Sequence, residues 1–203
     1  MNASYADDMT MRAARDRYFE VNGFGPDGGY KDAWVDFKLG PLPLPFPNTA
    51  GRISAVKFHD LHHLLTGYQT NATGEFEISA WEIGAGCTNM PAAWVINMSG
   101  LATGTITSPR RMLAAFVRGR RSRTLYREEF EPLLDQRVGD MRARFVGASE
   151  GAANSGDVAR FVVTALLAGM VGLGFASIML PLVPVGLVAS WLRRREATRS
   201  VSA

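Results

Sequence analysis

The sequence has few cysteines, few histidines and little net charge. Its 203 residues include a single cysteine, Cys87, and three histidines, and the formal net charge is +3. A lone cysteine excludes an internal disulfide and is typical of a reducing compartment. Because the net charge is small and few aromatic residues lie between the arginines, we expect no nucleic-acid partner. The length suffices for one domain with an appendage, but not for two full domains.

The N-terminal segment also lacks the apolar core of a secretory signal, so we expect the main domain to be cytoplasmic. The C-terminal end differs, since the 32 residues from Phe161 to Leu192 contain no charged side chain. About 20 apolar residues are enough to span a bilayer core. The sequence therefore predicts a membrane protein with a C-terminal transmembrane helix at 161–192.

The path of this segment in the bilayer has two alternatives. Pro181 and Pro184 divide the run, and arginines flank both of its ends. A helix that enters, breaks at the prolines and returns keeps both basic flanks on the cytoplasmic side. A single tilted crossing avoids a lipid-exposed break, at which backbone polar groups would lack partners. In either case we expect a kink rather than one straight span.

Glycines, prolines and capping residues divide the rest of the chain into helices, with one further helix, interrupted by a proline, at 126–145. The positions expected to begin or end a helix are Gly23, Asn48 or Thr49, Gly67, Gly74 or Glu75, Pro91 and Pro109. Four alternating prolines at 41–47 predict an extended strap. No alternating strand pattern is visible, so we expect an all-α fold.

Composition also predicts the domain organisation. Small polar residues follow the last expected helix and are typical of a linker. The expected parts are a helical metal-binding domain at 1–146, a linker at 147–160, the membrane anchor at 161–192 and a basic tail at 193–203.

All three histidines lie in the stretch FHDLHHLLTG at 58–67. On a helix His59 and His63 are four residues apart and lie one above the other on one face. Two imidazoles placed in this way can bind one metal ion. His62 points away from this face. Asp60 is close enough in sequence to act as an oxygen ligand, an orienting group or a base.

The next helix offers carboxylate ligands. Glu75 lies near its start, and Glu82 follows seven residues later in nearly the same direction. An antiparallel helix pair joined by the loop at 67–74 would bring Glu75 back toward His63. The alternative is a solvated polar helix face with surface ion pairs. The apolar residues around the histidines favour burial instead, where unpaired polar groups are costly.

The order His59-Asp60-x-x-His63, eleven further residues and Glu75 resembles the HDxxH-x11-E signature of the coenzyme Q (ubiquinone) biosynthesis protein 4 family. The flanking HDLHHLLTG and GE also fit the family, and weaker similarity covers roughly residues 15–145. The resemblance implies an all-helical fold in which these four residues surround a divalent metal. Zn²⁺ is the ion it implies, while Fe, Mn and Mg stay open.

The resemblance further implies membrane-associated work on a polyprenylated benzoquinone precursor. The family is linked to loss of the ring carboxylate, with hydroxylation at that carbon, and to organising the biosynthetic enzymes. We therefore expect a metal-dependent lyase (decarboxylase), in which Asp60 is a fourth ligand or the catalytic group that orients a bound water. The expected partners are a polyprenyl quinone precursor or other isoprenoid lipid, the membrane and a quinone-biosynthesis complex.

Two alternatives to this enzyme stay open. In a non-catalytic scaffold, the metal would only join two helices while the domain carries a lipid between enzymes. In a zinc metallopeptidase, Glu82 would be a downstream ligand. The peptidase fits less well, because such enzymes have a glutamate after the first histidine as general base, and Asp60 is one methylene shorter.

Residues 110–127 hold seven arginines and no acidic residue, beside an apolar helical stripe. This pattern fits an interfacial helix on anionic lipid, and it equally fits a solvated face next to a core stripe. Within the anchor, Ala168, Gly172 and Ala176 repeat at four-residue spacing. Small residues at this spacing allow two anchors to pack closely, as in a homodimer.

Overall fold

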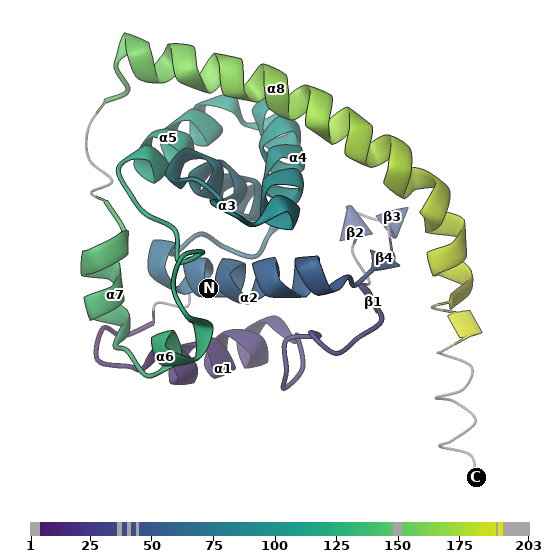
Figure 1. The fold of residues 1–203 in the computed structure, drawn as a ribbon, viewed down its shortest axis with the longest axis horizontal. Coiled ribbons are helices and arrows are strands. Elements are labelled where there is room, and N and C mark those ends of the chain that lie inside the picture. The colour runs from purple at the N-terminus through teal and green to yellow at the C-terminus, as the bar shows by residue number, and fades with distance from the viewer. Residues whose placement is uncertain are drawn as a thin grey trace.

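The computed structural model describes residues 5–35, 38–39, 42–43, 45–147, 152–189 and 191–192, and these residues confirm the all-α fold (Figure 1). The helices are α1 (Met11–Asn22), α2 (Ala50–Thr66), α3 (Ala72–Ala85), α4 (Pro91–Thr107), α5 (Pro109–Arg120), α6 (Phe130–Leu134), α7 (Val138–Phe145) and α8 (Ser155–Met179), with a 3-10 turn η1 (Leu180–Leu182). The predicted strap at 41–47 forms short antiparallel pairs with the residues before it, which are β1 (Trp34–Val35) with β4 (Phe46–Pro47) and β2 (Lys38–Leu39) with β3 (Leu42–Pro43). Residues 41 and 44 of the strap, and residues 36–37 and 40 before it, lie outside the described part of the chain.

Capping residues fix the ends of the two helices that carry the expected ligands. Thr49 Oγ1 accepts a hydrogen bond from the backbone N–H of Arg52 at the start of α2, and Gly67 ends α2 with a φ of 76°. Glycine adopts this left-handed conformation without steric cost. Asn71 Oδ1 accepts a hydrogen bond from the backbone N–H of Gly74 at the start of α3. The short loop between these caps returns the first turn of α3 to α2, as the sequence predicts.

α2 is the central helix, with α1 on one side and α3 and α4 on the other (Figure 1). Its Leu61 and Leu64 are fully buried, and its polar residues Asp60, His62 and His63 are buried as well. Polar groups in such a position require hydrogen-bond or metal partners, because their hydration is lost. The expected burial of the histidine stretch is therefore confirmed.

α3 and α5 cross at very short distance because both have a glycine at the contact. A Cβ atom at Gly84 would lie 2.2 Å from the carbonyl oxygen of Phe116, and one at Gly119 would lie 2.1 Å from that of Trp81. Both distances are too short for any larger residue. The close crossing holds α3 in place, and with it the two carboxylates expected at the site.

The segment predicted as one proline-interrupted helix at 126–145 forms two helices instead, and the break does not lie at the proline. Pro132 lies inside α6, whereas the chain leaves helical conformation after Leu134. There the backbone pairs with the start of α1, since Met11 N donates to the Gln136 carbonyl at 2.8 Å and Val138 N donates to the Met9 carbonyl at 2.9 Å. This long-range pairing, which no local signal shows, sets the break.

The apolar C-terminal segment is helical and lies along the domain (Figure 1). α8 begins at Ser155, behind a capping box of Asn154 and Asp157, and the helical segment runs to Ala189 with η1 around Pro181. In the described part of the chain this is one helix long and apolar enough to cross a membrane. The linker expected at 147–160 is therefore too long, since residues 155–160 belong to α8. Residues 148–151 of that linker, residue 190 of the expected anchor and the expected basic tail at 193–203 lie outside the described residues.

α8 contacts the domain through small residues and Phe161, and it exposes many of its other large residues. A Cβ atom at Gly172 would lie 3.5 Å from Ala102 Cβ on α4, and the rings of Phe161 and Phe116 lie 5.7 Å apart. The outer face of α8 is exposed and apolar, and its residues include Val162, Val163, Leu166, Leu167, Met170, Leu173 and Ile178. So large an apolar face indicates a membrane or a protein partner.

Several arginines of the basic stretch pair within the domain. Arg111 on α5 donates two hydrogen bonds to Glu77 at 2.8 and 2.7 Å, and Arg118 Nη1 donates to the Thr66 carbonyl at 2.9 Å. Arg120 lies 3.4 Å from Asp157 at the start of α8. These contacts indicate that the arginines form a polar face that joins α5 to its neighbours, rather than a lipid-binding surface.

Candidate metal centre

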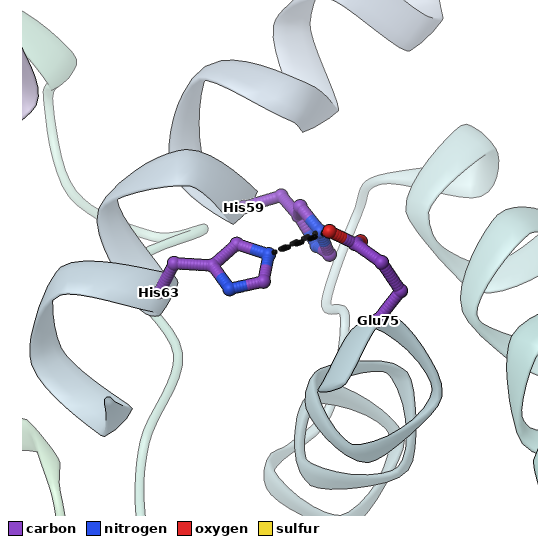
Figure 2. Close-up of side chains that lie close together, drawn as sticks. All are labelled: His59, His63 and Glu75. Carbon is purple, nitrogen blue, oxygen red and sulfur yellow. Dashed lines mark hydrogen bonds and ion pairs between the residues drawn. The ribbon is translucent and has the colours of Figure 1, made fainter. Parts of the chain in front are cut away.

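Two histidines of α2 and one glutamate of α3 point toward one another (Figure 2). Their possible ligand atoms, from His59, His63 and Glu75, all lie within 4.8 Å of one another. The two Nε2 atoms are 3.2 Å apart, Glu75 Oε2 lies 3.3 Å from His59 Nε2, and Glu75 Oε1 lies 3.4 Å from His63 Nε2. The helical i, i+4 pair and the return of α3 thus bring together three of the four residues predicted as ligands.

The orientation of His63 is fixed by contacts on the side of the ring that faces away from His59 and Glu75. Its Nδ1 lies 2.8 Å from the backbone carbonyl oxygen of Tyr68, and its ring stacks on Tyr18 with 5.6 Å between centroids. A carbonyl oxygen only accepts, so Nδ1 carries the proton and donates it. The lone pair of the neutral ring is therefore on Nε2, which faces His59 and Glu75.

His59 is oriented in the same way by Glu82. Its Nδ1 lies 2.9 Å from Glu82 Oε1, and the Glu82 side chain is fully buried. The carboxylate accepts the Nδ1–H, which leaves Nε2 to face the cluster. A histidine that binds a metal usually donates its other ring N–H to a carboxylate or a carbonyl, and here the two histidines show one case of each.

Two imidazole lone pairs and a carboxylate in one place require a cation. Burial alone lowers the pKa of His59, but the carboxylates of Glu82 and Glu75 outweigh it and hold this pKa well above its usual range. Burial would likewise raise the pKa of Glu75, and the charges of His63 and His59 lower it instead. The cluster therefore attracts a positive charge, which either a proton or a divalent metal ion supplies.

The donor set fits a divalent metal of the zinc type. Two imidazole nitrogens and one carboxylate oxygen form the ligand set of several catalytic zinc sites, in which a fourth position stays open. The side chain of Glu75 is 37% exposed, whereas that of His63 is 1% exposed. The open side of the site therefore lies at Glu75, where solvent or a substrate can approach.

Asp60 faces a different direction from the other predicted ligands. Its carboxylate accepts a short hydrogen bond from the Tyr30 hydroxyl, and among the described residues it does not join the three-residue group. Burial raises the pKa of Asp60, while the hydrogen bond from Tyr30 acts in the opposite direction. Adjacent residues of a helix point about 100° apart, so Asp60 and His59 diverge.

Glu82 has a role that sequence reasoning did not identify. Besides His59, it accepts a hydrogen bond from His62 Nδ1 at 2.7 Å, from the Tyr126 hydroxyl at 2.6 Å and from Asn97 Nδ2. In the metallopeptidase reading Glu82 would be a ligand, but here its carboxylate lies behind His59. The spacing of Glu75 and Glu82 indicated a shared direction, yet no local pattern reveals donors that lie 15 and 44 residues further along the chain.

No protein-family model matches the chain, and neither does any curated protein or solved structure. The resemblance to the coenzyme Q biosynthesis protein 4 family therefore stays a prediction from the motif. The geometry of His59, His63 and Glu75 stands independently of it.

Proposed function

We propose that this protein is a membrane-associated metalloprotein that removes the ring carboxylate of a polyprenylated precursor in ubiquinone biosynthesis. One observation carries the proposal. The Nε2 atoms of His59 and His63 and the carboxylate of Glu75 converge, and both rings are held from behind in the orientation that metal binding needs. The motif that these residues form supplies the substrate class.

The residues of the site have separate tasks in this proposal. His59, His63 and Glu75 would hold the ion, and Zn²⁺ suits their nitrogen and oxygen donors. A bound divalent metal would supply Lewis acidity toward oxygen atoms of the substrate head group, and through a ring oxygen it would stabilise the negative charge left on the ring as the C–C bond breaks. The electron pair of that bond would stay on the ring carbon, which would take up a proton from solvent water at the exposed side of the site. The carbon dioxide leaves through the exposed side at Glu75.

The apolar face of α8 supports work on a lipid. A polyprenyl chain lies in the bilayer, so an enzyme that acts on its head group must reach the membrane surface. α8 has the length and hydropathy of a membrane span, and its outer side chains, such as Leu166 and Leu173, are 69% and 73% exposed. We propose that the metal-binding domain lies on the cytoplasmic side of the membrane.

The proposal is tested on the full chain in lipid nanodiscs. The purified protein should contain about one equivalent of metal, and a polyprenylated hydroxybenzoate with a labelled carboxylate should release labelled carbon dioxide. Glu75→Gln should lose release, while Glu77→Gln, on the same helix, should retain it. Stoichiometric metal without any release would instead support the scaffold, and a protein with neither metal nor activity would refute both.

The scaffold is kept as a second candidate because of the exposed apolar face of α8, which suits a protein partner as well as a lipid. A scaffold should co-purify with a biosynthetic complex whose assembly survives Glu75→Gln. If Glu75→Gln abolishes quinone synthesis while the complex still assembles, the enzyme is favoured over the scaffold.

A further inference from the structure

We infer that Glu82 is the positioning residue of the metal centre: it holds His59 in the single orientation and tautomer that present Nε2 to the ion. This inference rests on the metal site proposed above and goes beyond it, because Glu82 is not a ligand. The structure assigns this role through hydrogen bonds that join α2, α3, α4 and the segment after α5.

The carboxylate of Glu82 is fully occupied by donors. Oε1 accepts from the Nδ1 atoms of His59 and His62, at 2.9 and 2.7 Å, and Oε2 accepts from Tyr126 and Asn97. A carboxylate has about four acceptor positions, and all of them are used here. Glu82 therefore has no lone pair left for a metal ion, and its whole acceptor capacity serves to orient its neighbours.

His62 locks the position of Glu82 itself. Its Nε2 accepts a hydrogen bond from the backbone N–H of Leu125 at 2.9 Å, so Nδ1 must carry the proton that it donates to Glu82. His62 is wholly buried, and its ring lies 5.2 Å from that of Trp81. Because donors from three other segments converge on it, the Glu82 carboxylate is held in place against His59.

Without Glu82, nothing in this network would select Nε2 of His59. A free imidazole interconverts between its two tautomers, and only one of them leaves the lone pair on the nitrogen that faces His63 and Glu75. Loss of an orienting partner of this kind typically weakens metal affinity about 10- to 100-fold. The charge of the carboxylate also makes the ring a better donor to the ion.

The variant that isolates this role is Glu82→Gln, since it keeps the size of the side chain. The Gln carbonyl can still accept from the imidazoles, but more weakly than a carboxylate. The new amide needs an acceptor on its other side. Asn97 Oδ1 is buried and has no hydrogen-bond partner among the described residues, so a flip of the Asn97 amide would supply one. Glu82→Gln should therefore fold.

The test compares the full chain with Glu82→Gln and Glu77→Gln in matched lipid nanodiscs. Glu77 lies on the same helix and pairs with Arg111, away from the histidines, so its variant removes the same charge as a control. Zn²⁺ affinity is measured by chelator competition. The tautomer of His59 is measured by ¹⁵N resonances of the imidazole ring in metal-free protein, at a pH high enough for the ring to be neutral. We expect Glu82→Gln to bind Zn²⁺ about 10- to 100-fold more weakly. It should also give a mixture of His59 tautomers, whereas the control should match the wild type.

The two readouts separate this inference from the proposed metal site. If the wild type binds Zn²⁺ and Glu82→Gln binds it equally well, the positioning role is wrong and the site stands. If the wild type binds no Zn²⁺, the metal site is wrong, and the tautomer measurement alone decides whether Glu82 fixes His59. An unchanged His59 tautomer in folded Glu82→Gln overturns the inference in either case.

Discussion

Replacing His63 with Ala tests the metal site and the packing around it separately. His63 is buried, and its ring stacks on Tyr18 and donates to the Tyr68 carbonyl. Its removal leaves a cavity and an unpaired carbonyl, which together should cost about 2–4 kcal/mol of stability without metal. A domain has only about 5–15 kcal/mol in total, so the variant should be less stable but still folded.

The metal contribution is a different quantity and is read from the shift that added Zn²⁺ causes. At about 100 times the dissociation constant, a ligand that binds only the folded state adds about 2.7 kcal/mol. For a chain of this size, about 1 kcal/mol corresponds to a rise of about 2–4 °C in Tm. We therefore expect Zn²⁺ to raise the Tm of the wild type by about 5–11 °C. The same addition should leave His63→Ala unchanged.

The assay is differential scanning fluorimetry of the full chain in detergent, with and without Zn²⁺, supported by metal analysis of the dialysed protein. Ser54→Ala, at an exposed position of the same helix, serves as the control and should keep the full shift. A metal-dependent shift of equal size in His63→Ala would refute the assignment of His63 as a ligand. A lower Tm of His63→Ala in the absence of metal would not support the assignment as a ligand, because this change in Tm reports packing alone.

Three further predictions concern the network, the helix crossing and the membrane face. Burial would raise the pKa of Glu82, but the adjacent imidazoles lower it, so its contribution to stability is present above pH ~4.5 and is lost at lower pH. In metal-free protein, the free energy of unfolding should thus fall less steeply with decreasing pH in Glu82→Gln than in the wild type. An equal dependence on pH in both proteins would contradict the hydrogen-bond network. Gly119→Ala should cost about 1–3 kcal/mol in chemical denaturation, because its methyl would meet the α3 backbone, whereas Gly169→Ala has open space and should not destabilise. Leu166→Glu with Leu173→Glu should abolish flotation with lipid vesicles, and unchanged flotation would exclude the outer face of α8 as the lipid contact.

The ligand-bearing helices were predictable because their signals are local. Thr49 and Gly67 bound α2, and the i, i+4 spacing of His59 and His63 places both rings on one face wherever the helix lies in the fold. To predict that Glu75 lies next to His63, one further assumption was needed, namely that a short loop reverses the direction of the chain. Each of these steps depends on geometry within a few residues, which sequence patterns report well.

The orienting network was not predictable, because its donors converge only after tertiary packing. Asn97 and Tyr126 reach Glu82 from separate segments, and neither stands in a recognisable motif. Asp60 shows the opposite case, in which a motif residue points to a partner, Tyr30, that lies 30 residues earlier in an irregular segment. A motif gives the identity of such residues, whereas the direction of each side chain depends on what packs against its helix.

The arrangement of carboxylates argues for a site with an open position rather than a closed structural one. A structural zinc ion usually takes four protein ligands, whereas a catalytic ion takes three and keeps a place for water or substrate. Glu82 accepts four hydrogen bonds and has no free acceptor position, and Asp60 accepts from Tyr30. The group that remains consists of two imidazoles and Glu75, whose partly exposed side chain lies on the solvent-accessible side of the site. An ion held by these three groups alone would leave room for a further ligand, and under the proposed function an oxygen atom of the substrate would be that ligand.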